Sequence, residues 1–594
     1  MSAVTEEVKR AFKTSPIKRK YKCLINWLTA KDTPGTVTAG EFNSTYFSKN
    51  SIIDGETLAR YEPWIFSASA RFRSDLRFLS TKYKFGWLGG NRSDSNGEFA
   101  SSEIISVIYD STHIVTDITI TSSRFNKLVN FDLYWRDSDN LNWVLAGNYT
   151  NVGEVNTVYK FSIKTEIKGL KLEIHKIERA NMFAQVVETQ IGFMDDISED
   201  IIKFEVNKEL EYESEKSLSI GNISANTIYL DLNNTNRRYN PKNEESDIQK
   251  YLKPNRKIKL YIGIDMVDEI VWFAQGVFYL REINPNPDMT ASIYAVDGMF
   301  FLKEEDFESS ILYENRKISE LVEILISAFG LSSYSIDVTD DIIPFAWFEP
   351  KRYATDIKEL AIAEGGVAYI DEDDRFIFHK RDWESEIIKE MISDEVIIKG
   401  SAHCPLIARN MKNSIKIRSN PLTLQIQQEI YSLTETISIP AGGTKNIACY
   451  FSKVPAKDVL DANVTAGVDI VKTSETKYAY ATFLKFKNTG GAPEDITEIT
   501  IQGKPLGRTG ANIITSEDSV LIEKYGKSEF SIDSGFIQNL THGQNLADSL
   551  LPQSSDPEAV IEFETMGLPY LSLGELIGLQ LDKMNIGKSE ETIK

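Results

Sequence analysis

The stretch from residue 85 to residue 97 contains the side chains best suited to bind a small polar ligand. It reads Phe-Gly-Trp-Leu-Gly-Gly-Asn-Arg-Ser-Asp-Ser-Asn-Gly, which is too rich in Gly, Asn and Ser for a regular element and predicts a loop. Sugar binding requires a flat aromatic ring to cover apolar C–H faces and planar polar side chains to pair with hydroxyls. The candidate carbohydrate-binding residues are Trp87, Asn91, Arg92, Asp94 and Asn96. The alternative is that Trp87 packs against neighbouring strands and that the loop is merely solvated.

The other reactive side chains form no recognisable catalytic or metal-binding motif. The five histidines lack zinc-type spacing, and neither a Gly-x-Ser-x-Gly nor a phosphate-binding Gly-Lys-Thr sequence occurs. The three cysteines are odd in number and far apart, which argues against a disulfide framework and favours a reducing compartment. Acidic runs such as residues 304–306 and 371–374 are expected in surface turns, without glycosidase chemistry. We therefore expect the protein not to be an enzyme.

The charge and hydropathy of the chain narrow the classes of partner. Sixty-six basic and eighty-seven acidic side chains give a net charge of −21, which argues against tight binding of nucleic-acid phosphates. Acidic walls that let DNA slide without sticking are one interpretation, and an ordinary solvated acidic surface is the other. No apolar run approaches the roughly 20 residues that cross a bilayer, and the N-terminus has charges where a signal peptide is apolar. We expect no membrane-spanning segment.

The elements around the candidate loop alternate apolar and polar residues. This period of two occurs in residues 115–120, 129–134 and 170–177 and is typical of half-buried strands. It predicts a complete β-sandwich at residues 36–195, inserted into a domain that begins with a strand at 21–28 and resumes after Asp196. Such an insertion separates a recognition module from a scaffold.

The scaffold is expected to combine a small barrel with an α+β unit. Five strands are predicted at residues 201–206, 227–234, 257–262, 271–280 and 291–296. Helices are predicted at 318–329 and 355–364, a hairpin at 365–379, a helix at 534–551 stopped by Pro552, and a strand at 559–564. The last residues show no obvious end to the fold, which suggests that a terminal strand or tail is missing from the chain.

The predicted fold class is mainly β with an α+β subdomain. The expected domains are a discontinuous first β-barrel (residues 1–35 and 196–300), the inserted β-sandwich (36–195), an α+β subdomain with strands (301–429), an accessory β-sandwich (430–507), and a C-terminal helix with strands (508–594).

The order of the outer pieces resembles that of bacteriophage tail hub proteins, also called baseplate hub or tail-tip proteins. The segments that carry the resemblance are residues 197–206, 231–241, 275–283, 355–376 and 568–575. The N-terminal helix with the basic strand that follows it and residues 295–298 also carry it. Each is a fold signature without chemistry, so the resemblance depends on their order, and together they extend across most of the chain outside the insertion. It implies a multidomain tail-hub fold and a homotrimeric ring at the distal end of the tail tube.

Residues 118–193 of the insertion resemble discoidin-like, galactose-binding β-sandwich modules. Residues 130–144 match the strand-and-turn pair of these modules, and residues 184–192 match the closing strand. Modules of this fold usually bind ligands, often sugars, through loops at one end, and some hold a structural calcium ion. By that pattern the calcium positions are Asp54 and Glu188. The alternative is an ordinary turn aspartate and a surface glutamate, and no other cofactor is expected.

These resemblances imply a structural role in a virion tail that is assembled in the cytoplasm of a bacterial host. The ring would close the tail tube, join the baseplate through the distal tail protein and the tape measure protein, and open for DNA passage without specific DNA binding. The inserted module would bind host cell-wall glycan or another tail protein. The alternatives are a carbohydrate-active or tail-associated cell-wall-degrading enzyme with a binding module, and a free-standing lectin-like adhesin.

Overall fold

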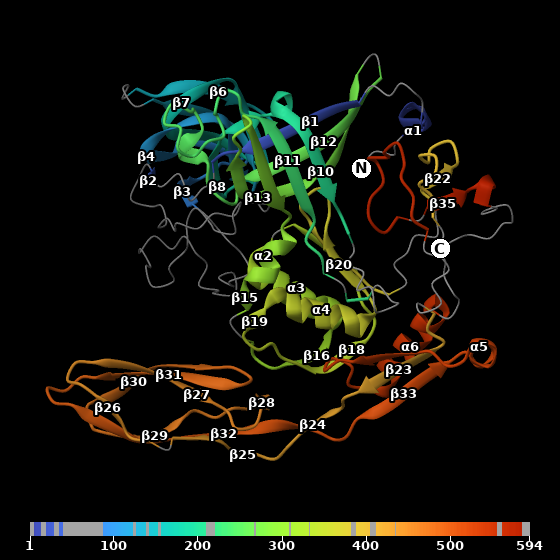
Figure 1. Ribbon diagram of the computed structural model, residues 1–594. Helices are drawn as coiled ribbons and strands as arrows, with labels where there is room; N and C mark the ends of the chain where they lie inside the picture. The colour runs from blue at the N-terminus through green and yellow to red at the C-terminus, as the bar shows by residue number, and fades with distance from the viewer. Residues whose placement is uncertain are drawn as a thin grey trace.

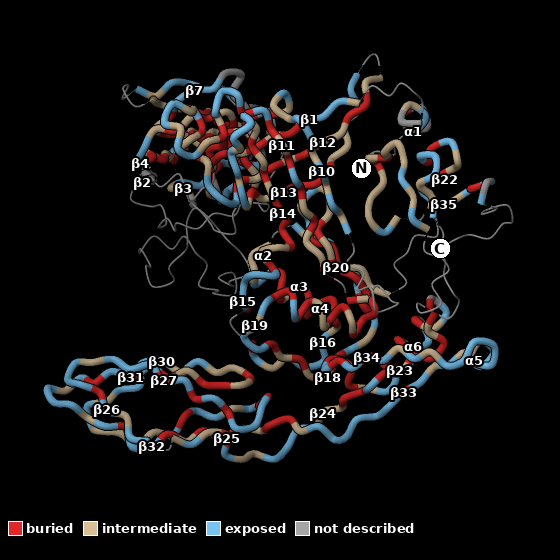
Figure 2. The backbone as a smooth tube through the Cα atoms, in the orientation of Figure 1, coloured by how far each residue is buried: buried red, intermediate tan, exposed pale blue. Residues whose placement is uncertain are grey.

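The chain folds mainly into β-sheets (Figure 1), as the sequence predicts. The computed structural model describes residues 5–13, 19–28, 35–39, 87–122, 126–137, 142–152, 156–209, 220–221, 223–266, 269–307, 310–331, 333–381, 388–403, 411–433, 435–554, 561–575 and 577–584. Among the described helices, none is both long and apolar enough to cross a bilayer. Buried residues, red in Figure 2, gather in the sheets and in the helical layer.

The scaffold begins with a seven-stranded antiparallel sheet in the order β10-β11-β14-β13-β12-β1-β9. Its strands are β1 (Arg19–Asn26), β9 (Met194–Asp196), β10 (Ile201–Asn207), β11 (Thr227–Asn233), β12 (Lys257–Asp265), β13 (Ile270–Pro285) and β14 (Thr290–Val296). The five predicted scaffold strands are confirmed, but the predicted barrel is wrong. The 3₁₀ turn η3 (Ser198–Asp200) joins the two edge strands, and β9 is too short to form a ladder with β10. The sheet therefore stays open.

The inserted segment forms two half-sheets that share their long strands. The strands are β2 (Gly35–Ala39), β3 (Trp87–Arg92), β4 (Glu98–Ser122), β5 (Leu128–Arg136), β6 (Val144–Tyr149), β7 (Asn156–Ile177) and β8 (Phe183–Gly192). The pairing of β4 with β7 shifts register between Ile108 and His113. Before the shift the order is β2-β4-β7-β5-β6, and after it the order is β3-β8-β4-β7. Apolar side chains of both halves share one core with the scaffold sheet.

The insertion is bonded to the scaffold where it leaves and re-enters. Asp195 is buried on β9 and accepts a hydrogen bond of 3.0 Å from the Trp27 indole N–H. The guanidinium of Arg238 pairs with the same carboxylate at 2.6 Å, and Lys164 of β7 reaches it at 3.3 Å. Removing one partner of a buried, paired carboxylate costs several kcal/mol of stability, on the order of 3 to 5. The bonds to Asp195 therefore fix the inserted sandwich on the scaffold sheet.

A helical layer and three small sheets follow, in the order the sequence predicts. The elements are α2 (Met299–Glu304), β15 (Asp306–Phe307), β16 (Tyr313–Lys317), α3 (Ile318–Phe329), β17 (Tyr334–Ile336), β18 (Ile342–Ala346), β19 (Lys351–Arg352), α4 (Tyr353–Glu364), β20 (Val367–Ile370) and β21 (Phe376–His379). Helix α3 has the predicted bounds because its apolar residues recur on one face and Gly330 ends it at φ 96°. The hairpin β20–β21 is confirmed.

Residues 422–508 form an elongated arm with its own core (Figure 1). Its strands are β24 (Leu422–Leu424), β25 (Gln428–Ser432), β26 (Ile437–Ile439), β27 (Thr444–Tyr450), β28 (Ala456–Lys457), β29 (Asn463–Ala466), β30 (Ile470–Lys477), β31 (Ala481–Asn488) and β32 (Glu494–Arg508). The long strand β32 pairs with five shorter strands, and β27-β31-β30 form a second sheet. We call this unit the accessory sandwich.

The remaining elements join the two ends of the chain to the scaffold. They are α1 (Glu6–Lys13), the 3₁₀ turn η4 (Gln249–Tyr251), β22 (Glu390–Ser393), β23 (Ser414–Ser419), β33 (Asn512–Glu517), α5 (Ser519–Tyr525), β34 (Glu529–Asp533), α6 (Leu540–Ser554), β35 (Ile577–Gln580) and the 3₁₀ turn η6 (Asp582–Met584). Strands β22 and β35 pair in parallel, and Val8 of α1 packs in the same cluster as Ile392 and Leu581.

Two C-terminal expectations are wrong. The helix predicted from residue 534 begins at Leu540, because the Asn539 side chain accepts the His542 N–H at 2.7 Å as an N-cap. It also continues past Pro552, which lies in its last turn. The strand predicted at 559–564 is reduced, in its described part, to the isolated bridge of Glu562 with His403.

Candidate functional site

The residues predicted to bind sugar lie at one end of the inserted sandwich. Residues 87–92 form β3 rather than a loop, and they pair with β8 across a register shift. The buried carboxylate of Glu103 explains the conformation: it accepts the N–H of Gly90, the N–H of Asn91 at 2.9 Å and the side-chain amide of Asn91 at 2.8 Å. The Asn91 amide is therefore already engaged by the protein. The side chain of Trp87 lies outside the described residues.

Asp94 closes a tight turn next to β3. Its carboxylate accepts the N–H groups of Glu98 and Asn96, both at 2.8 Å, and these bonds hold the pKa of Asp94 below its usual value. The guanidinium of Arg92 lies 5.3 Å from the ring centre of Phe183. Of the predicted residues, Asn91 and Asp94 thus support the turn, while Arg92 and Asn96 are exposed beside it.

The calcium positions are not brought together within the described part of the chain. Asp54 lies outside the described residues, and only the backbone of Glu188 is described, on β8 opposite Thr121 of β4. In the same ranges, three or more His, Cys, Asp or Glu side chains nowhere gather closely enough to hold one metal ion. The calcium site stays a prediction.

A second group of side chains, absent from the sequence prediction, lies on the outside of the half-sheet β4-β7-β5-β6. Residues on β5 and β7 alternate strictly there: Phe131, Leu133 and Leu172 are buried in the core, and their neighbours point outward. We call this outward surface the polar face. It consists of Ser102, Asp132, Tyr134, Trp143, Asn148, Lys171, Glu173 and His175.

A chain of hydrogen bonds crosses the polar face from strand to strand. The Ser102 hydroxyl lies 2.8 Å from Nδ1 of His175, and Nε2 of His175 lies 3.0 Å from the carboxylate of Asp132. The other oxygen of Asp132 accepts the Asn148 amide at 2.6 Å. Because each partner comes from a different strand, the sheet holds these polar groups at fixed spacing.

Two aromatic rings lie beside this chain. The Lys171 ammonium is 4.0 Å from the ring centre of Tyr134 and 5.6 Å from that of Trp143, and Arg136 is 5.2 Å from the latter. The Tyr134 hydroxyl donates to Glu173 at 3.2 Å, and partial burial together with that carboxylate raises the pKa of the phenol. Tyr134 is therefore a neutral hydrogen-bonding ring at ordinary pH.

The polar face offers the groups that a binding surface needs. A Ser–His–Asp relay activates a nucleophile only where donors for a developing oxyanion lie close by. Here His175 and Asp132 project from paired strands, and Ser102 lies at the break in the β4–β7 register between Glu98 and Glu103. The arrangement therefore offers aromatic surface and oriented donors and acceptors, which are the elements of sugar recognition.

The sequence contained a signal for this face. The alternation in residues 129–134 predicts that Asp132 and Tyr134 share one side of a strand, and the alternation in 170–177 predicts the same of Lys171, Glu173 and His175. The alternation does not show that β5 pairs with β7. That pairing joins residues about 40 positions apart in the sequence.

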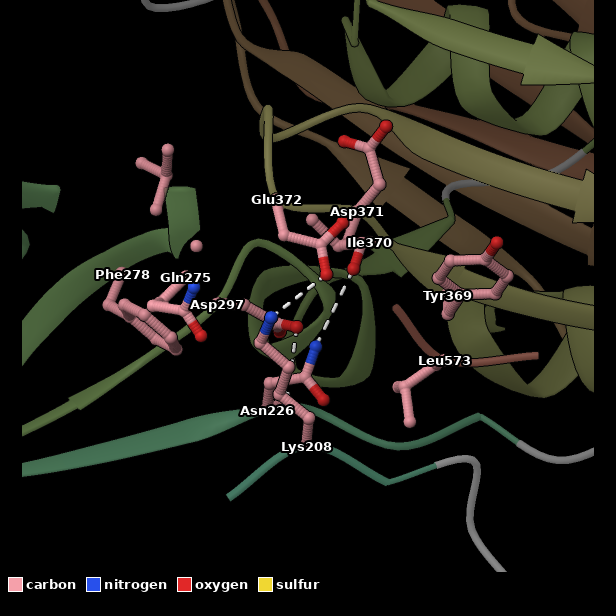
Figure 3. Close-up of a pocket in the computed structure, with 12 residues that line it drawn as sticks. Lys208, Asn226, Gln275, Phe278, Asp297, Tyr369, Ile370, Asp371, Glu372 and Leu573 are labelled. Carbon is pink, nitrogen blue, oxygen red and sulfur yellow. Dashed lines mark hydrogen bonds and ion pairs between the residues drawn. The ribbon is translucent and has the colours of Figure 1, made fainter. Parts of the chain in front are cut away.

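The enclosed cavity of the scaffold does not qualify as a ligand site (Figure 3). It lies between β13 and the turn of the β20–β21 hairpin and holds about 10 Å³, roughly the space for one water molecule. Its polar groups already bind one another: Asp297 accepts the Asn226 N–H at 3.0 Å, and Lys208 pairs with Glu372 at 2.8 Å.

The acidic run at residues 371–374 is part of this junction and not a freely solvated turn. Glu372 pairs with Lys208 of the scaffold, and Asp374 accepts from Lys257 at 2.9 Å and from the Tyr279 hydroxyl at 2.7 Å. Burial lowers the pKa of Lys257, but the neighbouring Tyr279 and Asp374 outweigh it and raise that pKa overall, whereas burial and Asp374 together raise the pKa of Tyr279. The run fastens the hairpin to the open sheet.

Comparison with known proteins finds structural similarity only at low identity. No family model and no curated protein matches the chain. A 43 kDa tail protein of prophage MuSo2 from Shewanella oneidensis is 11% identical over 61% of this chain and 82% of that one, with a TM-score of 0.32. A Ruminococcus gnavus GH29 fucosidase in complex with fucose is 13% identical over 16% of this chain, with a TM-score of 0.14. The module CpGH89CBM32-6 of Clostridium perfringens is 7% identical over 15% of this chain and 68% of that one, with a TM-score of 0.13.

The match to the fucosidase spans only 18% of that enzyme's length.

Proposed function

We propose that the protein is a structural component of a phage tail, of the hub type, and that its inserted sandwich binds a host cell-wall glycan through the polar face. The observation that carries the binding proposal is that Tyr134 and the bonded series Ser102, His175 and Asp132 lie on one sheet, with the Trp143 ring beside them just before β6.

The polar face meets the two requirements of sugar binding. Trp143 and Tyr134 offer ring surface for the apolar side of a sugar. Asp132, Asn148 and Glu173 are bonded to protein neighbours, but each carboxylate oxygen has a second lone pair and the Asn148 amide a second N–H for a sugar hydroxyl. Because the strands hold these groups before a ligand arrives, little conformational entropy is lost on binding. In the end turn of Asp94, one carboxylate oxygen, Oδ1, already accepts two backbone N–H groups.

Glycan binding is tested with the full chain on an array of bacterial cell-wall saccharides, followed by calorimetry on the best ligand. Replacing Trp143 by Ala is expected to weaken binding about tenfold or more, since loss of one stacked ring costs about 1 to 3 kcal/mol. Asp132→Ala is expected to act in the same direction. Trp272→Ala, on the scaffold sheet, is the matched control and leaves the affinity unchanged. If Asn96→Ala abolishes binding and Trp143→Ala does not, the ligand sits at the end turn and the proposal for the polar face fails.

The hub part of the proposal is supported by the order of the outer pieces, in which an interrupted sheet is followed by helices, an acidic hairpin and a late turn. The proposal includes a homotrimeric ring around a DNA path, with the distal tail protein and the tape measure protein as its neighbours. Light scattering of the purified protein and electron microscopy of assembled particles test it. A trimeric ring with peripheral lobes is expected, and a monomer that is absent from the tail tip would contradict it.

A further inference from the structure

The outward side of the sheet β27-β31-β30 in the accessory sandwich has a composition unlike the rest of this acidic chain. Ile447, Leu484 and Phe486 point into the core of the sandwich, so the residues between them point out. We call this surface the accessory face. Three of its rows, read from the strand register, are Ala448 with Phe483 and Thr476, then Asn446 with Lys485 and Ser474, then Thr444 with Lys487 and Val471. The end row is Tyr450, which pairs with Ala481 and lies beside the rings of Tyr478 and Tyr480 in the turn between β30 and β31.

The end row and the adjacent row with Phe483 form a cluster of four aromatic rings. The Tyr450 ring centre lies 5.9 Å from that of Tyr480 and 6.3 Å from that of Phe483, and Tyr478 lies 5.6 Å from Phe483. Tyr450 is 61% exposed, although a tyrosine normally has most of its ring covered. Part of a planar aromatic surface is thus open to solvent at one end of the accessory face.

The other two rows add positive charge and hydroxyl or amide groups. Several other lysines of this sandwich are neutralised: Lys457 pairs with Glu314, Lys477 with Asp461, and Lys504 with Asp458. Lys485 and Lys487 have no carboxylate partner among the described residues. In a chain with a net charge of −21, two adjacent unpaired lysines beside an aromatic cluster form a local site for negative charge.

We propose that the accessory face binds an anionic polysaccharide, with sugar rings on Tyr450 and its aromatic neighbours and acidic groups on Lys485 and Lys487. The four rows extend roughly 20 Å along the strands, which is enough for several linked sugar rings. Asn446, Ser474 and Thr476 lie between the two ends and can pair with hydroxyls. The site is separate from the polar face, so either can exist without the other.

Single-stranded nucleic acid is the main competing ligand, because bases also stack on aromatic rings. Nucleic-acid grooves neutralise a continuous backbone with many cations. The accessory face has two free lysines in a strongly acidic chain, and its middle rows carry small polar groups. This composition suits a chain with many hydroxyls and few charges.

The test uses the full-length protein with polygalacturonate as a carboxylate polymer, a phosphomannan as a phosphate polymer, dextran as the neutral polymer and oligothymidylate as the nucleic acid. Binding of at least one of the two acidic polysaccharides is expected, and it should weaken when the salt concentration rises to several times the physiological value. Dextran and oligothymidylate are expected to bind at least tenfold more weakly.

Variants assign this binding to the accessory face. The double substitution K485E/K487E and the single substitution Tyr450→Ala should each raise the dissociation constant about tenfold or more. The double substitution K242E/K399E changes the net charge equally at exposed sites elsewhere and should have no effect. The proposal is overturned if neither acidic polysaccharide binds, if K485E/K487E binds as the unmodified protein does, or if oligothymidylate is the preferred ligand. Loss of self-association in K485E/K487E, with polysaccharide binding intact, would assign the face to a second copy of the chain and overturn it equally.

Discussion

Asp297 links the stability of the scaffold to pH through the burial of one carboxyl group. It is almost fully buried at the junction of the sheet with α2, where it accepts the N–H groups of Asn226 and Met299, each at 3.0 Å. Burial raises the pKa of this carboxyl to about 7, although the two N–H donors act in the opposite direction. The folded protein thus holds a proton that the unfolded chain releases near pH 4.

We predict that Asp297→Asn flattens the pH dependence of stability. Because the folded pKa is raised, this group lowers the free energy of unfolding as the pH rises from about 4 to about 7, by up to roughly 4 kcal/mol. The asparagine stays neutral and can still accept one of the two N–H groups. Urea unfolding at pH 5, 6, 7 and 8 should show a smaller fall for the variant. Asp288→Asn, at an exposed turn, is the control for the loss of one charge, and an unchanged slope in Asp297→Asn would contradict the prediction.

At the scale of elements, the sequence predicts what local periodicity and capping determine. Helix α3, the hairpin β20–β21 and all five scaffold strands fall near their predicted positions because each depends on its own residues. Two features do not follow from local pattern. Whether the scaffold sheet closes depends on whether its two edge strands pair, and the polar face depends on side chains that come from different strands. The Glu103 carboxylate, which orders Gly90 and Asn91, is 13 residues from Gly90, in a strand whose face no local pattern assigns. These contacts join residues that are distant in the sequence. They explain why residues 87–92 form a strand where the sequence predicts a loop, and why the sequence does not predict the polar face.

The acidic turn of the β20–β21 hairpin is expected to stabilise the contact between the hairpin and the scaffold through the Lys208–Glu372 ion pair. Lys208 and Glu372 are both largely buried, at 18% and 13% side-chain exposure, so each depends on the other for neutralisation. We predict that Glu372→Lys destabilises the protein by about 2 to 4 kcal/mol, because two ammonium groups then meet at the junction. The reversed pair K208E/E372K should recover about half of the loss. Chemical unfolding of the two single variants and the double variant gives the coupling energy.

Glu314→Lys is the matched control for this prediction. Glu314 pairs with Lys457 at 2.7 Å, but both side chains are about one third exposed, so the substitution should cost about 1 kcal/mol or less. If Glu372→Lys and Glu314→Lys lower the free energy of unfolding equally, the Lys208–Glu372 pair contributes no more than an exposed ion pair and the prediction fails.

At the scale of the whole molecule, the described residues form units that differ in how far they depend on one another. The inserted sandwich and the scaffold sheet share one core, and the helical layer shares another with β23, β33 and α6. The accessory sandwich has a core of its own. Its recorded bonds to the helical layer include the Ala479 N–H donating to Ser310 at 3.1 Å and the Lys457–Glu314 pair. We infer that the inserted sandwich is integral to the fold and that the accessory sandwich is an appendage.

Excision of the accessory sandwich tests this division. Leu424 and Leu506 are paired across β24 and β32, so replacing residues 425–505 by Asn-Gly closes a two-residue hairpin without moving either strand. The lost hydrogen bond and exposed ion pair are together worth about 1 to 2 kcal/mol, so the remainder should unfold cooperatively and only slightly earlier than the full chain. Differential scanning calorimetry and hydrogen exchange in α3 and β16 measure this. The shortened protein should lose its affinity for acidic polysaccharide, keep its glycan binding through Trp143 and keep its oligomeric state. A shortened protein that aggregates or loses protection throughout α3 would show instead that the arm is required to complete the fold.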